Sequence, residues 1–126
     1  MILIDTDIAI DVLRSFPNAI AWLHTLNEEI AISGFTAMEL VQGCDNKTEQ
    51  RAVEKFLKSV VVLWLEPDSG QQALAIFAKY HLSHKVGLID ALIAQTAIDV
   101  KADLHTFNVK HYAPIALLKT IQPYKK

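Results

Sequence analysis

Three acidic residues and one amide stand where oxygen ligands for a metal ion would be needed. Asp5, Glu39, Asp90 and Asn108 each lie just after an expected strand or near the start of an expected helix. Side chains at the carboxyl ends of parallel strands meet at one edge of a sheet, where open α/β proteins hold ligands. Carboxylates gathered there repel one another unless a cation lies between them. Oxygen-only donors favour Mg²⁺ or Mn²⁺ over zinc, and such an ion suits phosphodiester hydrolysis.

Each of these residues also has an ordinary structural interpretation. Thr36 and Glu39 match a capping box, in which the glutamate bonds back to the backbone at the start of a helix. Asp90 suits the positive end of a helix dipole, and Asn108 is a good N-cap. Asp5 is harder to explain in this way, because an apolar strand buried on both faces can end on any turn residue.

The elements that would position these side chains alternate between strand and helix. A first strand is predicted from the start of the chain up to Asp5, and further strands at 30–33, 60–65, 103–106 and 120–122. Helices are predicted at 7–14, 17–26, 36–43, 48–59, 68–82 and 88–100, with a helical turn from 109. This alternation predicts an α/β fold, in which helices cover both faces of a mostly parallel central sheet in three layers. No linker or repeat interrupts the pattern, so residues 1–126 are expected to form a single domain.

The composition indicates a cytoplasmic protein with no membrane segment. The 126 residues are 52% hydrophobic, but the longest run of large apolar residues, 60–65, is far too short to cross a bilayer. Asp5 and Asp7 stand where a signal peptide would be purely apolar. The single Cys44 excludes an internal disulfide and a thiolate zinc site.

The charge is unevenly distributed along the chain. Residues 71–126 hold seven lysines and three aspartates, a net charge of +4, although the whole chain has a net charge of −2. A basic half beside a few carboxylates suits an enzyme that attracts a polyanion and cuts it with a metal. A solvated lysine surface is the alternative interpretation.

Four segments of the chain resemble the motifs of a known family. They are residues 2–6 (ILIDT), 32–43 (ISGFTAMELVQG), 87–94 (GLIDALIA) and 104–112 (LHTFNVKHY). In this order and at this spacing they are similar to the motifs of PIN-domain ribonucleases, and most of all to the VapC toxins of bacterial and archaeal toxin-antitoxin modules. The resemblance extends over essentially the whole chain.

This resemblance implies a three-layer α/β/α PIN-like domain and Mg²⁺-dependent endonucleolytic cleavage of RNA, with Mn²⁺ able to substitute. Asp5, Glu39 and Asp90 take the family's acidic catalytic and metal-binding positions, with Asp5 as the central ligand. Asn108 takes the fourth position, and Thr6 supplies the hydroxyl that follows the first acid. The resemblance also implies a homodimer and a small antitoxin protein whose tail covers the acidic pocket.

Two residues depart from the family pattern. Asn108 stands where Asp is frequent, so its amide oxygen can bind a metal but brings no charge. Asp7 stands where Ser or Asn is common, and it either restores that charge or acts as a first-turn acid of the helix. We hypothesise that Asp7→Ala weakens metal binding more than Asn108→Ala; equal metal titrations of the two variants would count against this.

Two other functions stay open at the level of the sequence. Asn108 is compatible with a non-catalytic PIN fold that binds RNA or a protein. The sequence Asp5-Thr6-Asp7 also resembles the nucleophile and acid of haloacid dehalogenase-like phosphatases. That family expects Thr or Val at the position of Ala9, and no paired acidic motif follows towards the C-terminal end.

Overall fold

A five-stranded parallel sheet with its first strand at the centre organises the computed structural model, which describes residues 1–126. The order across the sheet is β3-β2-β1-β4-β5, and every neighbouring pair is parallel. The strands are β1 (Ile2–Ile4), β2 (Ile30–Ser33), β3 (Val61–Leu63), β4 (Leu104–His105) and β5 (Thr120–Ile121). The predicted parallel sheet is confirmed. The carboxyl end of β1 therefore lies in the middle of the sheet edge.

The register of the central strands brings Thr106 beside Asp5. Leu3 pairs with Leu104, and Ile4 pairs with His105. The next residues along the two strands, Asp5 and Thr106, therefore lie beside each other. The Asp5 N–H donates to the His105 carbonyl at 2.9 Å, which continues the ladder to the end of β1. Two polar residues from distant parts of the chain thus meet where these strands end.

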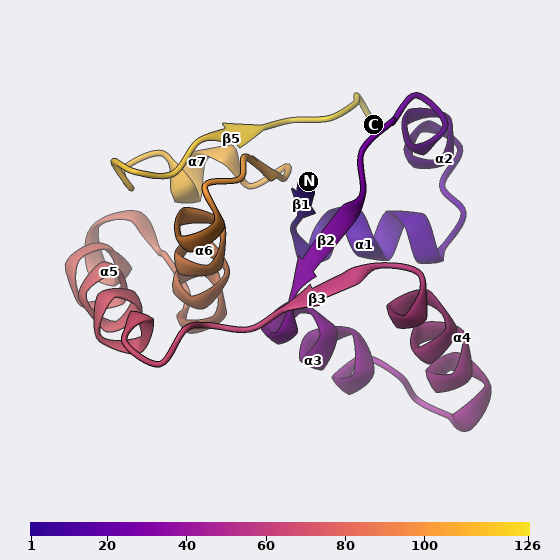
Figure 1. The fold of residues 1–126 in the computed structure, drawn as a ribbon, viewed down its shortest axis with the longest axis horizontal. Helices are drawn as coiled ribbons and strands as arrows, with labels where there is room; N and C mark the ends of the chain where they lie inside the picture. Colours follow the sequence, from indigo (N-terminus) through magenta and orange to yellow (C-terminus); the bar gives the residue numbers. More distant parts are fainter.

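Helices cover both faces of the sheet and produce the predicted three layers. They are α1 (Thr6–Leu13), α2 (Pro17–Leu23), α3 (Gly34–Gln42), α4 (Lys47–Lys58), α5 (Ser69–His84), α6 (Leu88–Val100) and α7 (Val109–Tyr112). Figure 1 shows α5 and α6 on one side of the sheet, with α1, α2 and α4 on the other. None of these helices is both long and apolar enough to cross a membrane.

Alternating side chains of β1 enter two separate cores. Ile2 and Ile4 pack with Ile8 of α1 in one core, whereas Leu3 packs with Ile93 of α6 in the other. This alternation follows from the two-residue period of a strand, and it accounts for the continuous apolar run before Asp5. Each fully buried Ile or Leu side chain contributes roughly 1.5 to 3 kcal/mol, so β1 is firmly fixed.

One predicted capping interaction is wrong. Helix α3 begins at Gly34 rather than 36, because Ser33 is the N-cap and its Oγ accepts the Phe35 N–H at 3.1 Å. Thr36 therefore lies inside the helix and does not form a capping box with Glu39. Gly34 is also required by packing, since a Cβ at this position would collide with the Trp64 ring.

Helix α2 is shorter than predicted. It ends at Leu23 instead of 26, because the next backbone bonds tighten into turns in which Thr25 N–H donates to Trp22 and Leu26 N–H donates to Leu23. The remaining predicted helices and strands are present, with ends within a few residues of their expected positions. The difference at α2 lies away from the carboxyl edge of the sheet.

Candidate active site

Asp5 lies at the centre of a hydrogen-bonded group of side chains. It ends β1 and caps α1, with Oδ1 accepting the Thr6 N–H at 2.8 Å. Its other oxygen, Oδ2, accepts the Thr106 hydroxyl at 2.7 Å and the Tyr112 hydroxyl at 3.2 Å. The residue is only 4% exposed. A buried carboxylate is thus held in one orientation by three donors from three parts of the chain.

Tyr112 also connects Asp5 to Asp90. Its hydroxyl lies 3.4 Å from Oδ1 of Asp90, while Oδ2 of Asp90 accepts the Gly87 N–H at 2.9 Å. This second bond caps the start of α6, so the structural interpretation of Asp90 is correct for one of its oxygens. The other oxygen faces the phenol that is shared with Asp5.

Glu39 joins the group through a different hydroxyl. Thr6 Oγ1 donates to Glu39 Oε1 at 2.7 Å and lies 3.1 Å from Thr36 Oγ1. Thr6 is the residue next to Asp5, so one turn of α1 carries a carboxylate and the hydroxyl that orients another. The structure therefore brings together Asp5, Glu39 and Asp90, linked in pairs through Thr6 and Tyr112.

Asp7 holds the segment that follows β4. Its Oδ1 accepts the Ile8 N–H at 2.8 Å and its Oδ2 accepts the Phe107 N–H at 2.9 Å. Asn108, the next residue, is exposed and its side chain makes no hydrogen bond with the protein, while its N–H donates to Thr106 Oγ1 at 3.0 Å. Asp7 is thus both a first-turn acid of α1 and an anchor for the backbone beside Asn108.

The electrostatics of the site oppose negative charge on Asp5. Burial, followed by the charge of Asp7 and a smaller contribution from Asp90, raises the pKa of Asp5 to about 6, although the hydrogen bonds from Thr106 and Thr6 lower it. Burial also raises the pKa of Asp7. Burial and the charge of Asp5 raise the pKa of the Tyr112 hydroxyl, which therefore keeps its proton as a donor.

The donor set fits a hard cation. The ion pairs of the structure are Met1–Glu28, Lys119–Asp103 and Lys126–Asp11, so no protein cation pairs with Asp5, Glu39 or Asp90. No group of three His, Cys, Asp or Glu side chains is close enough to hold a metal without rearrangement. Carboxylates that are linked through Thr6 and Tyr112 and lack a countercharge supply the oxygen chemistry that Mg²⁺ takes.

A sequence profile of the PIN domain matches residues 2–114. This chain belongs to the PIN-domain family. It is 40% identical over 116 residues to Ribonuclease VapC19 of Mycobacterium tuberculosis, an alignment that covers 89% of this chain and 92% of the relative. It is 34% identical over 122 residues to Ribonuclease VapC10 of the same organism, covering 94% of this chain and 91% of the relative.

Solved structures support the same assignment of this PIN domain. One chain of a toxin-antitoxin complex from Klebsiella pneumoniae superimposes with a TM-score of 0.82 at 27% identity, covering 100% of both chains. A chain of VapBC2 from Rickettsia felis, bound to a DNA fragment from their promoter, gives a TM-score of 0.79 at 26% identity, covering 96% of this chain and 98% of that chain. The predicted fold and the resemblance to VapC toxins are confirmed.

The sequence interpretation missed the part that two buried hydroxyls play in this PIN domain. Thr106 follows β4 as Asp5 follows β1, and the same rule about strand ends would have found it. Tyr112 gave no such signal, because an aromatic residue on a short helix normally indicates core packing. Its role depends on a tertiary contact with Asp5, which lies 107 positions away in the sequence.

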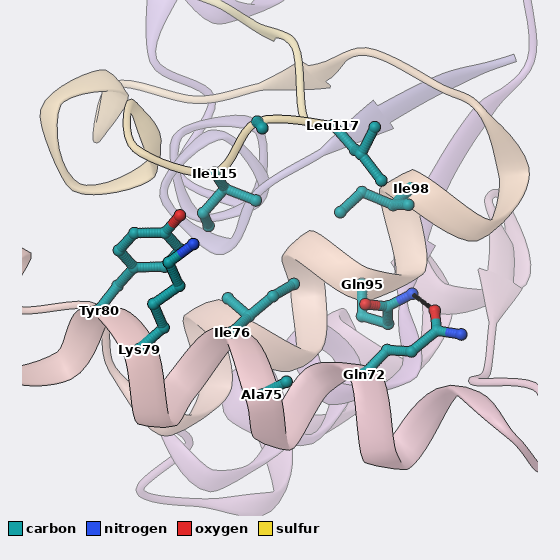
Figure 2. A pocket seen from close by; sticks show the side chains of 10 residues that line it. Gln72, Ala75, Ile76, Lys79, Tyr80, Gln95, Ile98, Ile115 and Leu117 are labelled. Carbon is teal, nitrogen blue, oxygen red and sulfur yellow. Dashed lines mark hydrogen bonds between the residues drawn. The ribbon is translucent and has the colours of Figure 1, made fainter.

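Two cavities of the PIN domain differ in how they lie relative to the acidic group. Glu39 and Arg14 line a cleft of about 430 Å³ between α1, α3 and α4. A second cavity of about 360 Å³ lies between α5, α6 and the segment after α7, with Gln95 bonded to Gln72 in its wall (Figure 2). None of the site acids lines the second cavity, whereas Glu39 places the first beside the candidate active site.

Proposed function

We propose that this PIN domain is the endoribonuclease toxin of a VapBC-like toxin-antitoxin pair, hydrolysing RNA phosphodiester bonds with Mg²⁺, or with Mn²⁺ in its place. The observation that carries this proposal is the buried Asp5 carboxylate, which shares the Tyr112 hydroxyl with Asp90, is bound to Thr6 beside Glu39, and is paired with no cation. The named relatives are ribonucleases, which favours this function over a phosphatase.

The acidic side chains have distinct roles in this proposal. Asp5, Glu39 and Asp90 hold the ion, and the exposed amide of Asn108 supplies a neutral oxygen. When bound, Mg²⁺ lowers the pKa of a water and stabilises negative charge on the phosphate and the leaving oxygen. Thr106 and Tyr112 keep the Asp5 carboxylate in place, and Thr6 orients Glu39. These bonds orient the Asp5 and Glu39 carboxylates individually, and the acids must move closer together to bind the ion.

The proposed partners are RNA, a small antitoxin and a second copy of the chain. The antitoxin is supported by the toxin-antitoxin complexes among the structural relatives. The second copy is supported by exposed apolar side chains on α5 and α6, where Leu74, Leu82 and Leu88 are 59%, 86% and 60% exposed. Residues 1–126 would act as one domain in the cytoplasm, where RNA substrates are present.

Cleavage of a structured RNA pool tests this function. The purified wild-type protein should cut RNA with Mg²⁺ or Mn²⁺ and stop when EDTA is added. Asp5→Asn should abolish cleavage while its circular dichroism spectrum stays that of a folded protein. Asp103→Asn is the matched control, because Asp103 lies in a surface ion pair away from the site. Absence of cleavage by folded wild-type protein with Mn²⁺ would leave the non-catalytic PIN module as the function.

A further inference from the structure

The segment after β5 crosses the protein and packs against α1, α2 and the residues that follow β4. From β5 it runs to α2, as Figure 1 shows in yellow, and the Lys125 carbonyl accepts the Asn18 side-chain N–H at 2.6 Å. The Tyr124 ring packs against Phe107 and Trp22, with ring centroids 5.0 and 5.9 Å apart. The Tyr124 hydroxyl donates to Asp11 at 2.7 Å. We call residues 123–126 the C-terminal strap.

The strap carries a positive charge to a defined place. The Lys126 ammonium lies 3.1 Å from Asp11 Oδ2 and 4.6 Å from the centre of the Phe107 ring. The Lys126 side chain is 48% exposed, whereas that of Asp11 is only 14% exposed. An ammonium held by a carboxylate and an aromatic face, yet half open to solvent, remains able to contact a further anion.

This place borders the acidic group. Phe107 lies between Thr106 and Asn108, and its N–H is bound by Asp7. Asp11 follows Asp7 by one helical turn, so both stand on one face of α1. The Lys126 charge also lowers the pKa of Asp7. Among the ion pairs of the structure, Lys126–Asp11 is the one that involves α1.

A polyanion that approaches this edge of the sheet meets several carboxylates. A nearby lysine offsets part of that repulsion and fixes the position of the backbone without reading its sequence. Lys126 is suited to this role because the strap holds it rather than leaving it on a mobile side chain alone. Lys125, its neighbour, forms no ion pair and is exposed.

We propose that Lys126 is a substrate-positioning residue whose ammonium binds an RNA phosphate flanking the bond that is cut. This inference rests on the proposed ribonuclease function, and it adds a residue of this chain that contacts the substrate. The ammonium exchanges its partner from Asp11 to the phosphate when RNA binds. The Tyr124 ring and hydroxyl keep the strap in place during this exchange.

A comparison of two adjacent lysines tests the inference. Lys126→Ala and Lys125→Ala remove the same charge from neighbouring positions, and both are made in an Asp5→Asn background so that RNA is bound but not cut. Binding of a fluorescein-labelled, mixed-sequence single-stranded RNA is followed by anisotropy over a series of salt concentrations. Lys126→Arg provides the conservative rescue, because it retains the charge.

We expect Lys126→Ala to weaken RNA binding by about threefold to tenfold and to reduce the salt slope by about 0.7, with a smaller change for Lys125→Ala and recovery in Lys126→Arg. In the protein with native Asp5, Lys126→Ala should raise KM more than it lowers kcat. Equal slopes for the two alanine variants, or no RNA binding by the Asp5→Asn protein, would overturn the inference. Absence of cleavage by the wild type would refute the proposed ribonuclease, while the binding comparison would still decide the role of Lys126.

Discussion

The hydroxyl of Tyr112 lies 3.2 Å from Oδ2 of Asp5 in the interior of the protein. The same hydroxyl is 3.4 Å from Asp90, so one phenol separates two acids that would otherwise repel each other. Because Tyr112 is 1% exposed, water cannot replace its hydroxyl without a change in packing. This shared hydroxyl, rather than an ion pair, links the two carboxylates.

Replacing Tyr112 by Phe should destabilise the metal-free protein while preserving its fold. The ring remains in the core, but Asp5 and Asp90 lose a shared donor, at a cost of about 1 to 3 kcal/mol in the free energy of unfolding. Urea denaturation measures this difference. Tyr80→Phe is the control, because the Tyr80 hydroxyl makes no hydrogen bond in the structure. Equal losses in the two variants would show that Tyr112 acts through packing alone.

The raised pKa of Asp5 predicts a dependence of stability on pH. Its pKa is about 6 in the folded protein against an ordinary value of 3.8, so the folded state holds the proton more tightly than the unfolded state. The contribution of Asp5 to the free energy of unfolding therefore falls by roughly 3 kcal/mol as the pH rises between these two values. At pH values above both pKa values, this contribution stays at its lower level. Asp7, with a pKa also raised by burial, acts in the same direction.

Comparison of the wild type with Asp5→Asn isolates this contribution. Without divalent ions, the difference in free energy of unfolding between the two proteins should change over this pH range and level off above it. Mg²⁺ favours the ionised carboxylate, so its stabilisation of the wild type should grow as the pH rises through 6. Chelation with EDTA should reverse the gain. An identical response to Mg²⁺ in Asp5→Asn would contradict the role of Asp5 as a ligand.

Much of the fold follows from local patterns in the sequence. The apolar run of β1 was predicted because burial on both faces of the sheet leaves a continuous hydrophobic signal, and the apolar helix α6 was predicted with its observed bounds. The start of α3 was not, because Ser33 competes with Thr36 for the N-cap and tertiary packing against Trp64 fixes the choice. Sequence alone does not rank two candidate N-cap residues that lie three positions apart.

The candidate site was predicted only in outline. The expectation that polar residues at strand ends and helix starts gather at one edge pointed to Asp5 and Asp90, and the structure brings them to a common hydroxyl. Direct convergence of the acids was expected, whereas in the structure Thr6 and Tyr112 stand between them. The contact of Tyr124 with Asp11 spans 113 positions of the chain and leaves no trace in any local pattern.

Asp7 and Asn108 should differ in their effect on metal binding. Asp7→Ala removes a nearby negative charge and leaves the Phe107 N–H without its acceptor, so the segment that carries Asn108 loosens. Asn108→Ala removes one exposed amide that bonds to nothing in the protein. Calorimetric titration with Mg²⁺ should therefore show a larger loss of affinity for Asp7→Ala. Equal titrations would contradict this order.

Adding a negative charge at position 108 tests whether this side chain binds the metal ion. Asn108→Asp supplies an ionised oxygen beside the existing acids, which should tighten Mg²⁺ binding by about tenfold. In the absence of metal the added charge should destabilise the protein, because it increases repulsion within the acidic group. Opposite effects on metal affinity and metal-free stability would locate Asn108 at the ion. An unchanged affinity would place its side chain away from the ion.

Thr106→Val should raise the pKa of Asp5 further. The Thr106 hydroxyl donates to Asp5 at 2.7 Å and lowers its pKa, so valine, which has nearly the same shape, removes a bond that favours the ionised carboxylate. Carbon-detected NMR of the Asp5 carboxyl in metal-free protein measures the shift directly. In this variant a larger fraction of Asp5 carries a proton that Mg²⁺ must displace. The apparent affinity for Mg²⁺ should therefore fall more at pH 6 than at pH 8. Thr96→Val is the control, because Thr96 is equally buried but donates to the Leu92 carbonyl. An unchanged Asp5 titration in Thr106→Val would show that this hydroxyl does not stabilise the carboxylate.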